Sequence, residues 1–383
     1  MIAALHLAAC STAVKLPEPA TTPEPVQPSP AAPLPPPAPP PTPDKSGFRV
    51  SIAAVGDMMI GTDYPDNHLP DDDGAGFLVD VAPVLAAADI AIGNLEGVLI
   101  DGGEPVKKCS NPAACYLFRS PTRYADHYKT AGFDVLSLAN NHARDFGEEG
   151  RTSSMRAIGE RGMYHSGREG DFASLEVNGL KIAFLAYAVT KNSNMMLDYE
   201  SAFTTVAHSA AHHDIVVVSF HGGAEGTDHM HLPFAEEEYF GEPRGDVVWF
   251  ARRAVDAGAD LVIGHGPHVV RAMERYKGRL IAYSLGNFAT YYGISVAGLK
   301  GVAPILTATL DGNGQFIEGM ITSTVQRRPA GPSIDRSQRA LREIHELSVT
   351  DFGKPGIEFQ PDGRLLPADR GEVKPHRLVV TPD

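Results

Sequence analysis

The sequence predicts an α/β protein built around parallel β-sheets. Short apolar runs typical of buried strands alternate with segments whose apolar residues recur at helical spacing. Most of the apolar runs end in a polar loop that contains glycine or asparagine. Alternation of this kind implies crossover units and sheets that are covered on both faces, and open α/β sheets place their ligands at the carboxyl ends of their strands.

The elements follow one another in a single stretch of the chain. The expected strands are short and apolar, and they cover residues 49–55, 89–92, 133–138, 181–187, 215–220, 260–263, 280–283 and 303–310. The expected helices have apolar residues three and four positions apart, and they cover residues 77–88, 122–131, 148–161, 247–257 and 337–347. We expect one globular domain over residues 48–326 and a peripheral C-terminal tail over residues 327–383, where the chain becomes polar and rich in Gly and Pro.

The N-terminal region predicts a membrane anchor. Residues 1–9 are apolar and end in Leu-Ala-Ala before Cys10, which resembles a bacterial lipobox, although the start of a buried helix is the alternative. In lipoproteins the signal is removed before the Cys, whose acyl chains then anchor the protein. No run of 18 apolar residues exists that would span a bilayer as a helix. We therefore expect a lipoprotein of the cell envelope, either periplasmic or anchored at the outer membrane.

A Pro-rich linker is expected over residues 10–47. Residues 17–43 contain 14 of the 31 prolines, a composition that favours disordered, extended polyproline II and leaves little to bury. The linker would act as a spacer between the membrane and the globular domain.

Cys109 and Cys115 bracket a proline turn. In an exported chain such a pair favours a disulfide, with a free thiol pair or a metal clip as alternatives.

Charge and motifs exclude several functions. Lys and Arg number 33 against 47 Asp and Glu, a net charge of −14, which argues against nucleic acid as a partner because such binding needs a basic face. An anionic substrate held at a local cationic site stays open. The chain has no Gly-x-Ser-x-Gly elbow and no Walker loop, so serine hydrolases and P-loop NTPases are excluded.

Side chains suited to metal binding collect at the expected strand ends. They are Asp57, Asn94, Glu96, Asn141, His142, His221, His265 and His268. Carboxylate, amide and imidazole ligands together suit a divalent metal such as Zn, Mn or Fe, whereas a thiolate site would need cysteines that are absent from these loops. A single strand-end His is weak evidence, but five polar strand ends in order favour one or two bound ions.

These motifs resemble a known family. The segments in question are Gly-Asp57, Gly-Asn94-Leu-Glu96, Asn140-Asn141-His142, Ser219-Phe-His221-Gly-Gly, Gly264-His265-Gly-Pro-His268 and Ser284-Leu-Gly-Asn287-Phe. They resemble the poly-gamma-glutamate capsule biosynthesis (CapA-like) family, a branch of the calcineurin-like metallophosphoesterases. The resemblance extends from about residue 48 to residue 321.

The resemblance implies a four-layer αββα sandwich of the metallo-dependent phosphatase type. It implies that Asp57 and His268 hold one metal ion, and that Asn141, His221 and His265 hold the other. Two ions in such a site lower the pKa of a bound water and stabilise the phosphoryl oxygens.

The resemblance also assigns roles to three neighbours of these ligands. Glu96 or Asn94 occupies the position of the bridging ligand, and we favour Glu96 because an anionic oxygen bridges two cations well. His142 corresponds to the catalytic acid that protonates the leaving group, with stabilisation of charge on the transferred phosphoryl group as the alternative.

The sequence departs from the phosphoesterase pattern at two positions. Met59 stands where Asp-x-His would place an imidazole, and Asn94 stands where an Asp is usual. Two hypotheses follow. The first is an exported metal-dependent hydrolase acting on a phosphoester or a cell-envelope polymer. The second is a non-catalytic accessory in the synthesis, export or anchoring of an anionic surface polymer such as poly-gamma-glutamate.

Further polar residues near these loops have both a structural and a functional interpretation. Glu225 and Asn287 would orient ligands or fix turns. Arg244, with Arg119 and Arg144, would recognise an anionic group or pair with a local carboxylate such as Asp145. The pair His212 and His213 favours a structural role. The Asp228–His231 loop is expected to be solvated, and the alternative is that it supplies the missing imidazole.

Overall fold

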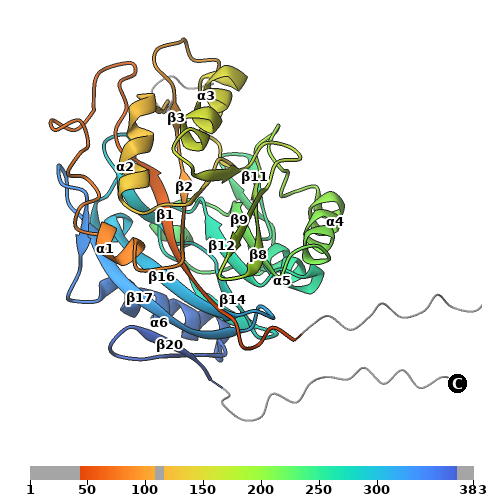
Figure 1. The fold of residues 1–383 in the computed structure, drawn as a ribbon. Helices are drawn as coiled ribbons and strands as arrows, with labels where there is room; N and C mark the ends of the chain where they lie inside the picture. The colour runs from red at the N-terminus through yellow and green to blue at the C-terminus, as the bar shows by residue number, and fades with distance from the viewer. Residues whose placement is uncertain (1–43, 108–115, 369–383) are drawn as a thin grey trace, which may run out of the picture. The chain divides into compact units, whose positions relative to one another are not determined.

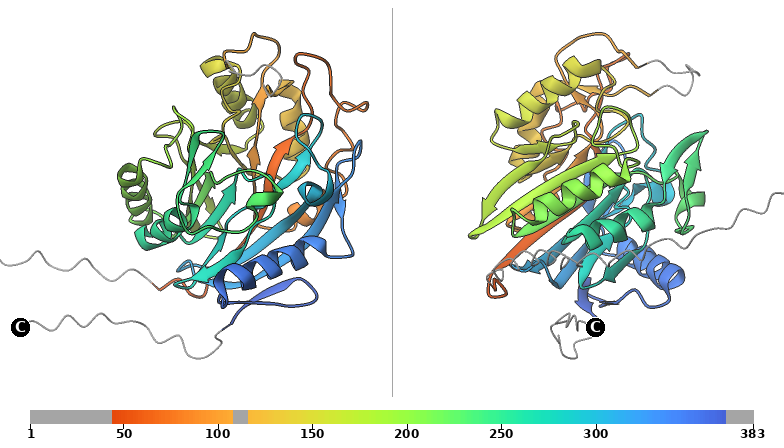
Figure 2. Two further views of the ribbon diagram at one scale, coloured as in Figure 1. Left: turned by 180° about the vertical axis from the view of Figure 1, so that it is seen from behind. Right: turned by 90° about the vertical axis from the view of Figure 1, so that its right-hand side faces the viewer.

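The computed structural model describes residues 44–107 and 116–368. Two β-sheets pack face to face, and helices cover their outer faces (Figure 1, Figure 2). Several predictions lie outside the described residues: the signal segment 1–9, Cys10, nearly all of the linker 10–47, and the pair Cys109 and Cys115.

The larger sheet joins the first strands of the domain to its last. In the described chain its order is β19 (Ile357–Phe359), β20 (Arg364–Pro367), β17 (Phe316–Gln326), β16 (Val302–Asp311), β1 (Arg49–Met59), β2 (Ile90–Leu95), β5 (Val135–Ser137) and β6 (Tyr164–Ser166). Strands β1, β2, β5 and β6 run parallel to one another, and β16 pairs antiparallel with β1. Two short strands join off this path: β15 (Asn287–Thr290) pairs with β1, and β18 (Pro332–Ile334) pairs with β17.

The smaller sheet is built from the middle of the chain. Its order is β13 (Met273–Tyr276), β14 (Arg279–Ala282), β12 (Leu261–His265), β9 (Ile215–His221), β8 (Leu180–Ala188) and β7 (Ala173–Val177). The four central strands are parallel and the two edge strands are antiparallel to their neighbours. Two small ribbons lie outside both sheets: β3 (Val98–Leu99) with β4 (Arg119–Ser120), and β10 (Glu237–Tyr239) with β11 (Glu242–Gly245).

The layers follow from the alternation of side chains along β1. Ile52 and Ala54 share a core with strands of the smaller sheet, whereas Ala53 and Val55 point to the opposite face and a separate core. That second core contains residues of α1 (Ala82–Leu85), α2 (Ala125–Thr130) and α3 (Gly147–Gly159), while α4 (Tyr199–Ala210) and α5 (Val247–Ala257) pack on the smaller sheet. The molecule therefore has the predicted αββα layers. No helix in the described part has the length and apolar character needed to cross a membrane.

Helix α5 shows how the sequence sets an element. The Asp246 side chain accepts a hydrogen bond from the Trp249 backbone N–H and caps the first turn, and Gly258 ends the helix in the left-handed region at φ +117°. Val247, Phe250 and residues 251, 254 and 255 are buried at helical spacing. The chain can therefore turn directly into β12.

Two helix predictions need correction. The helix expected at 77–88 is reduced to α1, because Pro83 fits only the first turn of a helix and the preceding residues form turns. Helix α4 was expected only as a helix that ends near His212 and His213, with no start assigned. Its buried residues are Ala202, Val206 and Ser209, which give only a weak apolar pattern.

The segment expected as a peripheral tail adds strands to the larger sheet. Strands β18 and β20 both pair with β17, and α6 (Arg339–Phe352) buries Leu341, Ile344 and Leu347 in the core that the two sheets share. The physical reason is the apolar face of α6, which needs a partner surface and finds it on β17 and β13. The described residues up to 368 are thus packed onto the domain.

Candidate metal centre

Strand register brings the polar strand ends together. In the larger sheet, Asp57 of β1 lies opposite Asn94 of β2 and Asn287 of β15. In the smaller sheet, His221 of β9 lies opposite His265 of β12. The two sheets meet at this edge, where Asp57 of the larger sheet contacts His265 and His268 of the smaller sheet and its following loop. This arrangement is the one expected when parallel strands end in functional loops.

Gly56 allows β1 to approach the loop before β15. A Cβ atom on residue 56 would lie 1.9 Å from the carbonyl oxygen of Gly286, which also accepts a hydrogen bond from the Asp57 N–H at 2.9 Å. Only glycine permits this approach. The backbone of Asp57 is therefore held against the loop before β15.

Asp57, Glu96 and His221 form the closest group of possible metal ligands in the described chain. One ligand atom from each lies within 4.8 Å of the other two, and the three residues are 0, 0 and 1% exposed. Both carboxylate oxygens of Glu96 and Nε2 of His221 are buried without a hydrogen-bond partner. Buried polar atoms are normally paired, so these three unused acceptor positions fit a cation.

His268 connects the two sheets. Its Nδ1 lies 2.9 Å from Asp57 Oδ2 and 3.0 Å from Asn287 Oδ1, and its Nε2 lies 3.6 Å from Glu96 Oε1. His268 adopts φ +58°, a backbone conformation that is unfavourable for residues other than glycine. The Asn287 side chain stabilises this conformation by donating a hydrogen bond to the His268 carbonyl. His265 approaches the same carboxylate, with Nδ1 3.5 Å from Asp57 Oδ1.

The titrating groups of the centre have displaced pKa values. Burial and the charge of Asp57 raise the pKa of Glu96 well above its usual value. Burial opposes ionisation of Asp57 too, but contacts with His265 and His268 outweigh it and hold its pKa well below the usual value. Burial lowers the pKa of His221 strongly. For His268 burial acts downward, yet Glu96 and Asp57 raise its pKa to about 10.

Asn94 and Asn140 orient the first carboxylate. Asn94 Nδ2 donates to Asp57 Oδ1 at 2.9 Å and lies 3.4 Å from His221 Nδ1, while Asn140 Nδ2 donates to Asn94 Oδ1 at 2.9 Å. Asn140 also accepts from the His142 backbone N–H. Asn94 therefore acts as a hydrogen-bond partner of Asp57. Of the two alternatives for the bridging ligand, Asn94 and Glu96, only Glu96 has both side-chain oxygens free of hydrogen bonds. Asn141 Oδ1, another predicted ligand, is buried without a hydrogen-bond partner.

His142 is held by a buried carboxylate that sequence reasoning had assigned elsewhere. Its Nδ1 lies 2.8 Å from Oδ2 of the fully buried Asp145, and Lys107 Nζ lies 3.1 Å from Oδ1 of the same carboxylate. The Phe118 N–H also donates to Asp145 Oδ2. Burial lowers the pKa of His142. The spacing His-x-x-Asp was the available signal, but a sequence does not show which neighbour a carboxylate faces.

The predicted arginines do pair with carboxylates, though none of them pairs with Asp145. Arg244 Nη2 lies 2.8 Å from Glu225 Oε1, and Arg119 pairs with Asp63. Arg144 approaches Glu148, so the expected pairing with Asp145 was wrong. Glu225 Oε2 in turn lies 4.0 Å from His268 Nε2, which places Glu225 at the border of the centre.

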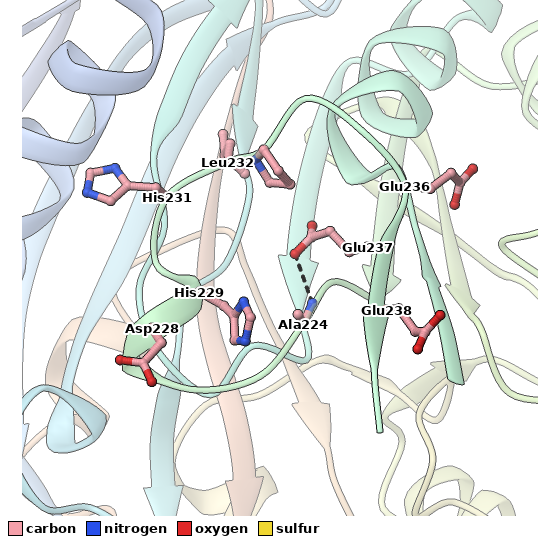
Figure 3. Close-up of a pocket in the computed structure, with 9 residues that line it drawn as sticks. Ala224, Asp228, His229, His231, Leu232, Glu236, Glu237 and Glu238 are labelled. Atoms are coloured by element: carbon pink, nitrogen blue, oxygen red, sulfur yellow. Dashed lines mark hydrogen bonds between the residues drawn. The ribbon is translucent and has the colours of Figure 1, made fainter. Parts of the chain in front are cut away.

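The loop after Glu225 surrounds a separate cavity of about 350 Å³ (Figure 3). Glu237 accepts a hydrogen bond from the Ala224 N–H and pairs with the fully buried Arg271, which fixes the loop. His231 pairs with Asp351 at 2.7 Å, and both His229 and His231 are exposed. The loop imidazoles thus line the cavity and do not belong to the group around Asp57.

Comparisons with known proteins agree with this site. A family model for "Bacterial capsule synthesis protein PGA_cap" matches residues 51–292. The chain belongs to this family. The match includes every strand end described above, from Asp57 to Asn287, so the family resemblance and the metal centre coincide.

Three curated relatives of the PGA_cap chain have names that refer to the synthesis of a capsule or polymer. The capsule biosynthesis protein CapA of Bacillus anthracis is 28% identical over 83% of this chain and 77% of that protein. The PGA biosynthesis protein CapA of Bacillus subtilis (strain 168) is 29% identical over 62% of this chain and 63% of that protein. A Mycobacterium tuberculosis protein named "Probable polyglutamine synthesis accessory protein" is 26% identical over 54% of this chain and 57% of that protein.

Two solved structures also resemble it. A 5'-nucleotidase precursor from Thermus thermophilus has a TM-score of 0.41 and 15% identity, covering 78% of this chain and 59% of that chain. The purple acid phosphatase PPD1 of yellow lupin (Lupinus luteus) has a TM-score of 0.37 and 10% identity, covering 79% of this chain and 56% of that chain.

Proposed function

We propose that this PGA_cap protein is a metal-dependent hydrolase of the cell envelope that acts on a phosphoester or on a surface polymer during capsule or poly-gamma-glutamate biosynthesis. The main support is the fully buried Glu96, which lies next to Asp57 and His221. Neither of its carboxylate oxygens has a hydrogen-bond partner. Leaving a buried acceptor unpaired is costly, and a divalent cation satisfies it directly. The names of the CapA relatives support the link to the envelope polymer.

The donor set fits one or two Zn, Mn or Fe ions. Asp57, Glu96 and His221 would hold the first ion, with His265, His268 and Asn141 as the additional ligands. When bound, such ions lower the pKa of a coordinated water and stabilise charge on a phosphoryl group. We further propose that the chain is exported and anchored through lipid on Cys10, with a disulfide between Cys109 and Cys115.

The chain's own residues supply the proton transfer. With Nδ1 of His142 engaged by Asp145, Nε2 is the nitrogen that remains to donate a proton to a leaving group. The Phe118 ring lies 4.3 Å from the imidazole centroid and helps to exclude water from it. Burial of His142 favours its neutral form, in which Nε2 carries no proton when Nδ1–H donates to Asp145. His142 must therefore bind the proton that it transfers when the substrate binds.

A non-catalytic accessory role has one specific observation in its favour. Met59, at the position where phosphoesterases place an imidazole, is 1% exposed and packs with Phe118 and Ile294. The first ion would therefore lack one nitrogen ligand. The accessory name of the Mycobacterium tuberculosis relative agrees with this alternative.

Metal analysis followed by an ester assay separates the two roles. The purified full chain would be analysed for bound metal and then assayed with p-nitrophenyl phosphate in the presence of Mn²⁺, Zn²⁺ or Fe²⁺. We expect His142→Ala to lower kcat by roughly 10²- to 10⁴-fold, as for other general acids. His213→Ala, beyond the end of α4, is the control and should keep full activity. Equal inactivity of the wild type and His142→Ala would favour the accessory role, and loss of surface polymer on deletion of the gene together with that inactivity would support it further.

A further inference from the structure

Three arginines surround one carboxylate beside the metal centre. Arg168 Nη2 lies 2.5 Å from Glu148 Oε1, Arg151 Nη2 lies 2.5 Å from Oε2, and Arg144 Nε lies 3.4 Å from Oε2. In the described part of the chain, Glu148 is the only carboxylate within ion-pair distance of these three guanidinium groups. One negative charge therefore faces three positive charges, in a protein whose net charge is −14.

This arginine cluster (Arg144, Arg151 and Arg168) leaves donors unused. The Nε atom of each of the three guanidinium groups is buried and makes no hydrogen bond, and that of Arg144 reaches Glu148 only as an ion pair at 3.4 Å. Arg151 is 4% exposed, and burial is the main reason that its pKa is lowered, with the charges of Arg168 and Arg144 adding to the effect. Both observations indicate that Glu148 compensates the cluster only in part.

The cluster lies at the same sheet edge as the metal centre. Arg144 is in the loop that follows β5, two residues after His142, and Arg168 follows β6, which is the neighbour of β5 in the larger sheet. Arg151 Nη1 donates to the carbonyl of Asn192, in the loop that follows β8. Strand β8 pairs with β9, whose last residue is His221.

Two of the guanidinium groups are accessible from solvent. The side chains of Arg144 and Arg168 are 36 and 34% exposed, and that of Glu148 is 48% exposed. An incoming anion can reach them without unfolding of the loop. Planar guanidinium forks match the geometry of carboxylate and phosphate oxygens, and several forks around one anion increase the strength of the contact.

We propose that the arginine cluster binds an oxyanion group, a carboxylate or a phosphate, of a polyanionic substrate whose reacting bond lies at the metal centre. Glu148 holds the forks in place in the absence of that group and competes with it. The assignment of the anion to a substrate rests on the proposed function, whereas anion binding itself does not depend on hydrolysis.

Calorimetric titration of the metal-free full chain tests the proposal. Chelation removes any metal ion that could itself bind the anion, and the arginine variants then show whether the remaining anion binding occurs at the cluster. The protein would be titrated at low salt with inorganic phosphate in one experiment and with glutarate in another, because exposed charges are screened at high ionic strength. Comparison of the two probes shows whether phosphate or carboxylate is preferred, and binding of either supports the site.

The variants separate binding from a structural role. We expect Arg168→Gln to weaken binding of the preferred anion roughly tenfold and Glu148→Gln to tighten it by a similar factor, because the latter removes the competing carboxylate. Arg253→Gln on α5, whose side chain is 53% exposed and pairs with Asp256, is the control and should bind as the wild type does. Arg144→Gln serves as the second variant should Arg168→Gln unfold, and thermal melting of each variant verifies its fold.

Absence of binding by the wild type to both probes would overturn the proposal. So would unchanged affinity in the arginine variants, or an affinity of Glu148→Gln no higher than that of the wild type, which is the result expected if the cluster only joins loops. Retained anion binding in a protein without ester hydrolysis would count against the hydrolase proposal alone.

Discussion

Replacing Glu96 with Gln should change stability in opposite directions in the metal-free and metal-loaded protein. The buried centre contains Asp57, Glu96 and the adjacent Glu225 around a single imidazolium, that of His268, because burial holds His221 neutral. Arg244, whose Nη2 lies 2.8 Å from Glu225 Oε1, compensates Glu225, so without a metal Asp57 and Glu96 share the one imidazolium. Glu96→Gln removes an ionisable carboxyl, whose pKa burial and the charge of Asp57 raise, from a position that has no hydrogen-bond partner.

The expected magnitudes follow from the burial of this carboxylate. At neutral pH Glu96 is ionised in the unfolded chain, whereas the metal-free fold must either bury that charge or protonate it. Gln avoids this cost, so metal-free Glu96→Gln should be more stable than the wild type by about 1–3 kcal/mol. In the metal-loaded protein the variant loses an anionic ligand. A loss of roughly 100-fold in metal affinity corresponds to about 2.7 kcal/mol of stabilisation lost at the same metal concentration.

Urea denaturation with and without saturating Mn²⁺ or Zn²⁺ measures both quantities. Glu225→Gln is the matched control, since Glu225 has a partner in the buried Arg244 and its replacement leaves that arginine unpaired. It should destabilise both forms. The reasoning is refuted if metal-free Glu96→Gln is less stable than the wild type and gains as much from metal as the wild type does.

Three further predictions concern other parts of the chain. Asp145→Asn removes the carboxylate at 2.8 Å from His142 Nδ1 and should lower kcat for ester hydrolysis roughly 10²-fold with little change in KM, and an unchanged kcat would contradict the positioning role. Burial raises the pKa of Asp260 from 3.8 to about 6, so its protonated form favours the fold. This contribution is complete below pH 3.8 and is lost as the pH rises through 6, an effect of about 3 kcal/mol that urea denaturation at pH 4 and 7 would detect and that Asp260→Asn should abolish. In bacteria that attach lipid to lipoproteins, Cys10→Ala should release the protein from the membrane fraction. A variant that stays in the membrane fraction would exclude the lipid anchor.

Part of the centre could be predicted because parallel strands deliver their ends to one edge. His221 and His265 end neighbouring strands of the smaller sheet, so this position implies that they meet, whereas Asp57 ends a strand of the larger sheet and reaches them only through the packing of the two sheets, which the family resemblance implied. The partner of His142 could not be predicted, since Asp145 is directed inward by the Phe118 N–H and by Lys107, residues that lie distant in sequence. Pairing of the segment after residue 326 with β17 is likewise a long-range contact that its polar composition conceals.

Opposite charges at the same sheet edge explain why the net charge of the chain is a poor guide to its substrate. The metal centre gathers carboxylates that repel anions until a cation binds, whereas the arginine cluster holds two positive charges in excess a few residues further along the chain. His142 lies between Asn141 of the centre and Arg144 of the cluster in sequence. A polyanion held by the arginines is thus directed toward a centre that accepts it only when metal is present, so substrate affinity should depend on metal more strongly than the affinity of an isolated anion does.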